Sequence, residues 1–116
     1  NHAGNVNDCA ITAWDALPAI SDAVGGKLTI IADTGVRRGS DVIKGLALGA
    51  DVVAVGRATL YGVAAAGETG ATRALEILEA EIRRTMAVMG INQILDISRD
   101  HIRLPADLPV SGNSQL

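Results

Sequence analysis

Two short aliphatic runs, each followed by a polar loop with glycine, alternate with longer amphipathic segments along this chain. The runs cover residues 28–32 and 52–55. Neither run alternates regularly with polar residues, so we expect two strands that are buried on both faces. Because a helical pattern separates them, they are expected to be parallel neighbours in an α/β fold.

The first amphipathic segment predicts a helix that starts directly after Thr12. This residue is a suitable N-cap, and Asp15 stands three positions later, as in a capping box. Apolar residues then recur at spacings of three and four until Gly25, where the helix is expected to end. Pro18 lies inside the segment and predicts a kink or a later start.

Three more helices are expected after the first aliphatic run. Ser40 is the predicted cap of a helix that continues to Ala50. A short helix over 59–66 and a long one over 71–89 follow, with the glycines of 67–70 between them. Two strands alone do not make a stable sheet, so the chain is expected to be part of a larger one.

This order of elements is typical of the last βα units of a (β/α)₈ TIM barrel. We expect residues 1–104 to form units 7 and 8 together with a catalytic loop before them, and residues 105–116 to form a flexible tail. We therefore expect the remaining, N-terminal units of the barrel to be a partner of this chain.

Composition narrows the possible partners. Hydrophobic residues make up 48% of the chain and aromatic residues only 2%, which suits aliphatic helices packed on parallel strands. The net charge of -3 gives no reason to expect a nucleic-acid partner. The single cysteine, Cys9, is compatible with a reducing cytoplasm, and two isolated histidines lack the spacing of a metal site.

Both predicted strands lead into a junction that contains glycine and arginine. Gly35 and Arg37 follow the first strand, and Gly56 and Arg57 follow the second. Glycine lets backbone N–H groups approach an anion, a helix start adds partial positive charge, and arginine donates a fork of hydrogen bonds to phosphate. Arg38 adjoins Arg37, so we expect one to hold phosphate and the other to pair with an acid.

Two further residues are candidates for proton transfer. His2 lies in a loop of small residues and is either a general base or an exposed loop histidine. Asp33 ends the first strand, where barrels place their active sites, but it could equally brace the loop.

Three segments resemble the FMN-dependent α-hydroxy acid dehydrogenase and oxidase family: residues 33–41, 44–50 and 56–62. The resemblance implies a (β/α)₈ flavoprotein oxidoreductase with FMN as cofactor. It further implies a small 2-hydroxy acid as substrate, oxidised at its α-carbon, and a homo-oligomer.

Carried onto this sequence, the resemblance implies that His2 is the catalytic base and that Asp33 braces it. The residues it implies for FMN binding are Asp33, Gly35, Arg37, Gly56 and Arg57.

One position departs from the family pattern. Members usually carry an arginine for the substrate carboxylate where this chain has Asn5, which with His2 is the expected substrate contact. Asparagine has no charge to offer a carboxylate. A similar pattern in the mycofactocin-associated branch makes oxidation of a peptide-derived amine an alternative. A non-redox phosphate-binding TIM-barrel enzyme is another.

Overall fold

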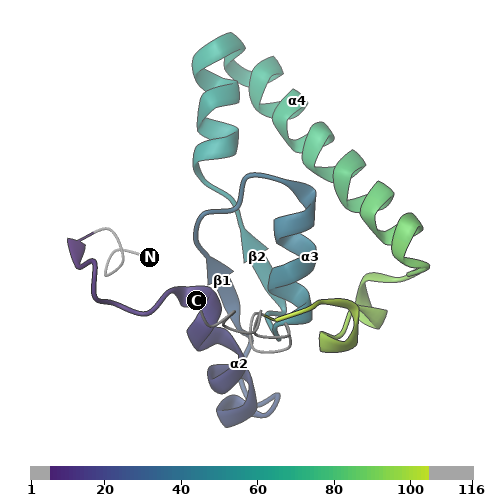
Figure 1. Cartoon of the computed structure of the whole chain (residues 1–116). Helices are drawn as coiled ribbons and strands as arrows, with labels where there is room; N and C mark the ends of the chain where they lie inside the picture. Colours follow the sequence, from purple (N-terminus) through teal and green to yellow (C-terminus); the bar gives the residue numbers. More distant parts are fainter. Residues whose placement is uncertain (1–5, 105–116) are drawn as a thin grey trace, which may run out of the picture.

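The computed structural model describes residues 6–104 of the chain. Its helices and strands alternate as expected for an α/β fold (Figure 1). In order they are α2 (Ala13–Val24), β1 (Ile31–Asp33), α3 (Gly39–Ala47), β2 (Val52–Ala54) and α4 (Arg57–Met89), followed by the short 3₁₀ helices η1 (Ile94–Asp96) and η2 (Arg99–His101).

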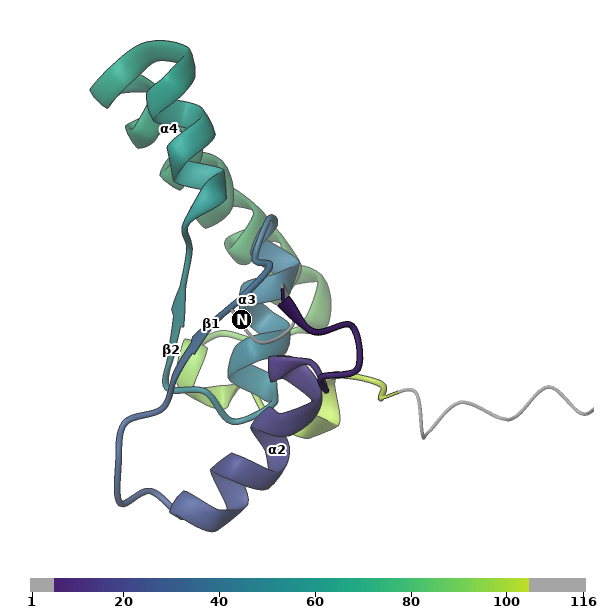
Figure 2. The ribbon, with the colours of Figure 1, turned by 90° about the vertical axis from the view of Figure 1, so that its left-hand side faces the viewer.

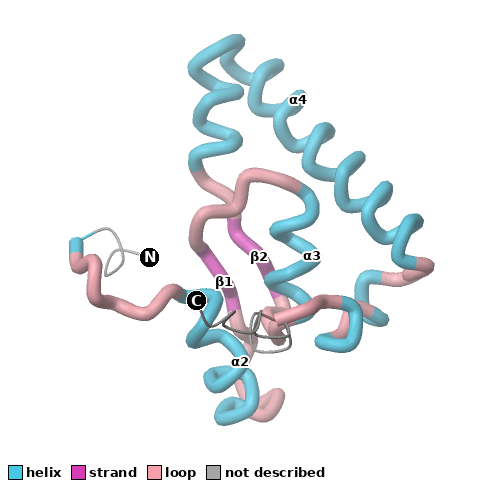
Figure 3. Tube along the Cα trace, in the orientation of Figure 1, coloured by secondary structure: helices cyan, strands magenta, loops and turns pink. Residues whose placement is uncertain are grey.

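The two strands pair in parallel, which confirms the predicted connection through a helix. Ile31 is opposite Val52, and Asp33 is opposite Ala54, so both strands end at the same edge (Figure 3). The first strand starts three residues later than expected and extends one residue further.

The expectation that both faces of these strands are buried is wrong within residues 6–104. Ala32 is buried, whereas its neighbours Ile31 and Asp33 are exposed. Figure 2 shows the reason, because β1 and β2 have α3 on one side only. One face of the strand pair is therefore open.

Two small apolar clusters hold these elements together. The first joins Leu17 of α2 with Ala32 of β1, and with Leu48 and Ala50. The second connects α3 with α4 and the segment after it; its buried members are Ile43, Met86 and Ile91. Burying a side chain such as Ile43 contributes roughly 1.5–3 kcal/mol, so these contacts fix α4 against α3.

The first helix is built as its sequence predicts. The Thr12 hydroxyl oxygen accepts a hydrogen bond from the Asp15 N–H at 3.2 Å, and Gly25 is the C-cap. The helix continues through Pro18 from its expected start.

The start of α3 differs from the prediction. The N-cap is Arg38 rather than Ser40, and the helix ends at Ala47 rather than Ala50. The physical reason is that Asp41, in the first turn, reaches back to accept the backbone N–H groups of the residues before the helix.

The two helices expected after β2 are the arms of α4, and they meet at a sharp break. Ala66 and Gly67 have non-helical backbone angles, so the break comes at the start of the predicted 67–70 interruption. Gly67 has a φ of 59°, a left-handed conformation that glycine adopts without strain. The arms form a hairpin (Figure 1), and Gly62 of one packs on Gly70 of the other.

Candidate functional site

A pocket of about 730 Å³ lies where both strands end. It brings together the two glycine-arginine junctions, as the parallel arrangement predicts. Its lining includes Asp33, Gly35, Arg37, Gly56, Arg57 and Tyr61.

The two glycines leave open space beside the backbone in this pocket. A Cβ atom added at Gly35 or at Gly56 would meet nothing within 4 Å. Gly35 also has a φ of 58°, which disfavours any other residue there. A ligand can therefore approach the main chain closely at both junctions.

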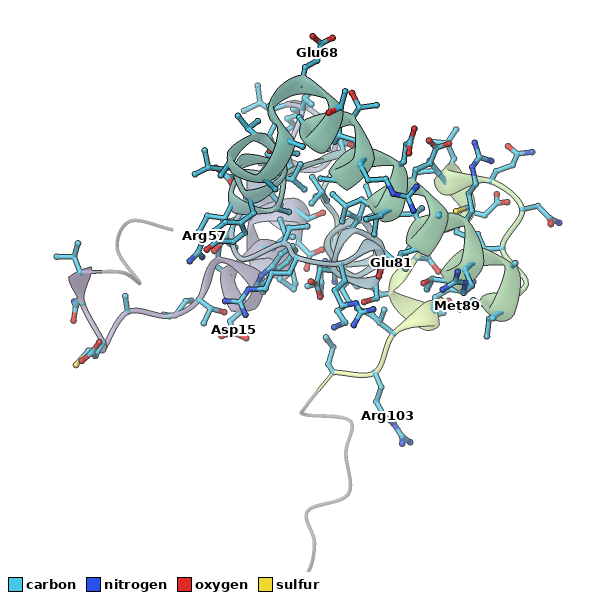
Figure 4. All side chains as sticks on the ribbon, turned by 90° about the horizontal axis from the view of Figure 1, so that it is seen from above. Asp15, Arg57, Glu68, Glu81, Met89 and Arg103 are labelled. Atoms are coloured by element: carbon cyan, nitrogen blue, oxygen red, sulfur yellow. The ribbon has the colours of Figure 1, made fainter. Side chains whose placement is uncertain are left out.

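One of the two adjacent arginines pairs with an acid, as expected. The Arg38 Nη2 atom lies 2.9 Å from Glu81 Oε1 and forms an ion pair with it. Arg37 lines the pocket and has no ion pair within residues 6–104. Viewed from above, Arg57 lies toward the left of the molecule and Glu81 lies nearer its centre (Figure 4), so the ion pair stands apart from Arg57.

Three backbone N–H groups around the start of α3 already bind carboxylates of the chain itself. Asp41 Oδ2 accepts the backbone N–H groups of Arg37 and Arg38, both at 3.1 Å. Glu81 Oε2 accepts that of Gly39 at 2.8 Å. Two carboxylates of the protein already use these three donors.

These contacts shift the pKa values of both carboxyl groups. Partial burial alone would raise the pKa of Asp41, but the N–H groups of Arg37 and Arg38, with the Lys44 ammonium, outweigh it and lower the pKa below 3.8. The Gly39 N–H, followed by the Arg38 guanidinium, lowers the pKa of Glu81 below 4.5. Both groups are carboxylates at neutral pH.

The start of α4 is different, because its first N–H groups have no protein partner in the part of the chain that the structure describes. The Gly56 carbonyl accepts from the N–H groups of Thr59 and Leu60, while those of Arg57 and Ala58 belong to the unpaired first turn. With the Arg57 side chain, this turn can hold an anion.

Asp33 places a carboxylate at the strand end, in the same pocket as the two arginines. His2 and Asn5 lie outside the described residues. The proposed brace between Asp33 and His2 therefore stays a prediction.

Tyr61 is a pocket residue to which our sequence analysis gave no role. It follows Arg57 by four positions on the same helix, so one turn places both on one face. That spacing was the available signal. The exposed ring offers an aromatic face and a hydroxyl group to a ligand.

Residues 6–104 contain neither a cluster of metal ligands nor a helix suited to span a membrane. No three His, Cys, Asp or Glu side chains gather there in a way that could hold a metal ion. None of the helices in that range combines the length and apolar character that crossing a bilayer requires.

Comparison with known proteins decides the family. Residues 1–104 match the family model of the FMN-dependent dehydrogenases. The chain belongs to this family. Its residues are 47% identical over 102 positions to an L-lactate dehydrogenase of Yersinia pestis (strain Pestoides F), covering 88% of this chain and 27% of the relative.

Solved structures of similar proteins share the fold of this FMN-dependent dehydrogenase chain. A soluble mutant of the membrane-associated (S)-mandelate dehydrogenase from Pseudomonas putida matches with a TM-score of 0.75 and 45% identity, over 83% of this chain and 27% of that one. A mandelate oxidase mutant with a monooxide FMN adduct matches with a TM-score of 0.76 and 38% identity, over 79% and 29%. The chain thus spans about a quarter of the length of its relatives.

Proposed function

We propose that this chain forms units 7 and 8 of a (β/α)₈ barrel and holds the phosphate end of FMN. The observation that carries the proposal is the pocket at the strand ends, where Arg37 and Arg57 stand beside two open glycine backbones. These residues fit a phosphate ester, because both guanidinium groups are free of protein carboxylates within residues 6–104 and the first turn of α4 adds N–H donors.

The proposed reaction is the oxidation of the α-carbon of a small 2-hydroxy acid. Bound FMN would supply a two-electron acceptor for it. In this proposal His2 takes the proton that leaves the substrate, and Asp33 stabilises the resulting imidazolium. Similarity to lactate and mandelate dehydrogenases supports this substrate class.

Asn5 favours a second candidate, the oxidation of a peptide-derived amine. An asparagine donates hydrogen bonds to a substrate but gives a carboxylate no opposite charge. A substrate without a carboxylate at the reacting carbon would lose no binding contact when asparagine replaces arginine at this position.

The location and assembly of the enzyme belong to the same proposal. The single cysteine of this chain is compatible with a cytoplasmic protein, and the family resemblance supports a homo-oligomer. The mandelate dehydrogenase relative is membrane-associated, so cell fractionation followed by size-exclusion chromatography tests both points.

The deciding experiment is the visible absorption spectrum of the chain assembled with the residues that complete its barrel. We expect the two bands of oxidised flavin, and anaerobic addition of L-lactate or (S)-mandelate should bleach them. Bleaching only by an amine would select the second candidate. A His2→Ala variant should keep the colour and lose the bleaching; normal bleaching would contradict the role of His2.

A colourless protein that binds no added FMN would overturn the proposed function. Retained binding of a phosphorylated metabolite by such a protein would select a non-redox barrel enzyme instead.

A further inference from the structure

Glu81 is an acidic side chain of α4 that reaches across to the loop after β1. Its two oxygens have separate partners there: Oε1 lies 2.9 Å from Arg38 Nη2, and Oε2 lies 2.8 Å from the Gly39 nitrogen. The Glu81 side chain is 21% exposed, against 71% for Arg38, so the contact lies partly below the surface.

The start of α3 packs tightly against α4 around this contact. Gly39 is buried, and a Cβ atom there would lie 2.6 Å from the Glu81 Cβ and against the backbone nitrogen of Ile82. The backbone of α4 therefore lies directly on the start of α3. The Glu81 carboxylate also faces the positive end of the α3 dipole, which favours its charged form.

Other acidic residues of the second arm behave differently. Glu76 pairs with Arg73, and Glu79 pairs with Arg83, each within a turn of the same helix and largely in solvent. Such exposed pairs contribute little to stability. Glu81, by contrast, connects two elements that are far apart in the sequence.

The loop that Glu81 holds is the one that carries Arg37. Glu81 fixes the two residues that follow Arg37, and Asp41 fixes the Arg37 N–H itself. Arg57 belongs to the other arm of the same helix α4. One helix thus carries one phosphate-binding arginine and, through Glu81, anchors the loop of the other.

We propose that Glu81 is a positioning residue for the phosphate of FMN, because it sets where Arg37 stands relative to Arg57. This inference rests on the proposed function. Glu81 itself does not touch the cofactor. Its effect is transmitted through the backbone of residues 37–39 and is specific for the phosphate end of the ligand.

The test compares FMN with riboflavin, which has the same ring and ribityl chain but no phosphate. Dissociation constants are measured by flavin fluorescence for the assembled barrel, as wild type, Glu81→Ala and Glu81→Gln. The matched control is Glu79→Gln, which removes an exposed acidic pair from the same helix arm.

We expect Glu81→Ala to weaken FMN binding roughly tenfold and to leave riboflavin binding unchanged. Glu81→Gln keeps an acceptor for the Gly39 N–H but loses the charge opposite Arg38, so it should fall between wild type and Glu81→Ala. It also provides the measurement if the alanine variant does not fold. Glu79→Gln should match wild type. In an Arg37→Gln background, Glu81→Ala should have no further effect on FMN.

Equal weakening of FMN and riboflavin would mean that Glu81 serves stability alone, and would overturn the inference. Wild-type affinity for FMN in folded Glu81 variants would do the same. These outcomes differ from a failure of the proposed function, in which the wild-type barrel itself binds no FMN.

Discussion

Arg37 and Arg57 are the two arginines of the pocket, and neither forms an ion pair with a carboxylate of the described residues. Arg38, Arg73, Arg83 and Arg99 all have acidic partners, and the pairs of the last three lie largely in solvent. An exposed ion pair is worth about 0–1 kcal/mol, whereas a hydrogen bond to a charged group contributes about 1.5–3 kcal/mol. A phosphate group is therefore expected to gain more binding free energy from the two unpaired arginines of the pocket than from the arginines that already have ion pairs.

Replacing Arg57 tests this directly. We expect Arg57→Gln to weaken FMN binding by about 1.5–3 kcal/mol, or roughly ten- to hundredfold, because a charge-assisted contact is lost. Arg73→Gln, which breaks an exposed pair on the same helix, is the control and should have no effect. Isothermal titration of the assembled barrel measures both. Equal affinities in the two variants would remove Arg57 from the site.

The carboxylates beside the Arg37 loop predict a pH dependence of stability. The folded-state pKa of Glu81 lies below its ordinary value of 4.5, and that of Asp41 lies below 3.8. The unfolded chain therefore binds protons more tightly than the folded chain does. The two carboxylates stabilise the fold fully above pH 4.5, and this stabilisation is lost as the pH falls through their lowered folded-state pKa values.

Denaturant unfolding at a series of pH values between 6 and 3 checks this expectation, with the range set by those pKa values. The decline of the free energy of unfolding on acidification should be shallower in Glu81→Gln than in wild type. An identical decline would show that Glu81 does not contribute to it.

At the scale of single residues, the sequence predicted the glycines and arginines of the pocket but not their surroundings. The adjacency of Arg37 and Arg38 predicted that one of them pairs with an acid, which the Arg38–Glu81 ion pair confirms, while phosphate binding by Arg37 stays a prediction. The acidic partner of Arg38 could not be predicted from the sequence, because Glu81 is 43 positions away and its local pattern is that of a solvated helix face. The roles of His2 and Asn5 stay predictions.

Among the elements, the contact between α3 and α4 depends on the absence of a side chain at Gly39. We expect Gly39→Ala to lower the free energy of unfolding by about 1–3 kcal/mol, because the added methyl group meets the backbone of α4. Ser40→Ala is the control, since Ser40 is not the cap of α3 and should cost little. Thermal unfolding compares the two. A larger loss for Ser40→Ala would contradict the observed cap.

The sequence predicted which segments form helices. The residues at which the helices begin and end depended in part on contacts with distant residues. Thr12 and Asp15 are close neighbours, so the start of α2 could be read correctly. The start of α3 was misplaced because Asp41 and Glu81 stabilise a turn that Ser40 alone would not produce. Asp41 is only three positions from Arg38, whereas Glu81 is 42 positions from Gly39, and helix propensity records no partner that distant.

At the scale of the whole molecule, the open face of the strand pair is the surface that further barrel strands would cover. Ile31 is 64% exposed on that face although it is an isoleucine in a strand. We expect Ile31→Asp to prevent assembly of a flavin-binding barrel, because burying an unpaired carboxylate costs several kcal/mol.

Val88→Asp is the matched control, since Val88 is 83% exposed on α4, away from the strands. Flavin content after size-exclusion chromatography measures assembly in both variants. Full flavin content in Ile31→Asp would mean that this face stays open in the working enzyme.

The bend at Ala66 and Gly67 has a consequence for how this chain can be altered. The contact between Gly62 and Gly70 holds the two arms of α4 together below the bend, while Ala65, Gly67 and Glu68 lie in solvent. A peptide tag or a fluorophore inserted between Gly67 and Glu68 would therefore project away from the pocket, provided that Gly67 keeps its left-handed backbone. The hairpin tip is thus a natural place to attach a reporter of flavin occupancy.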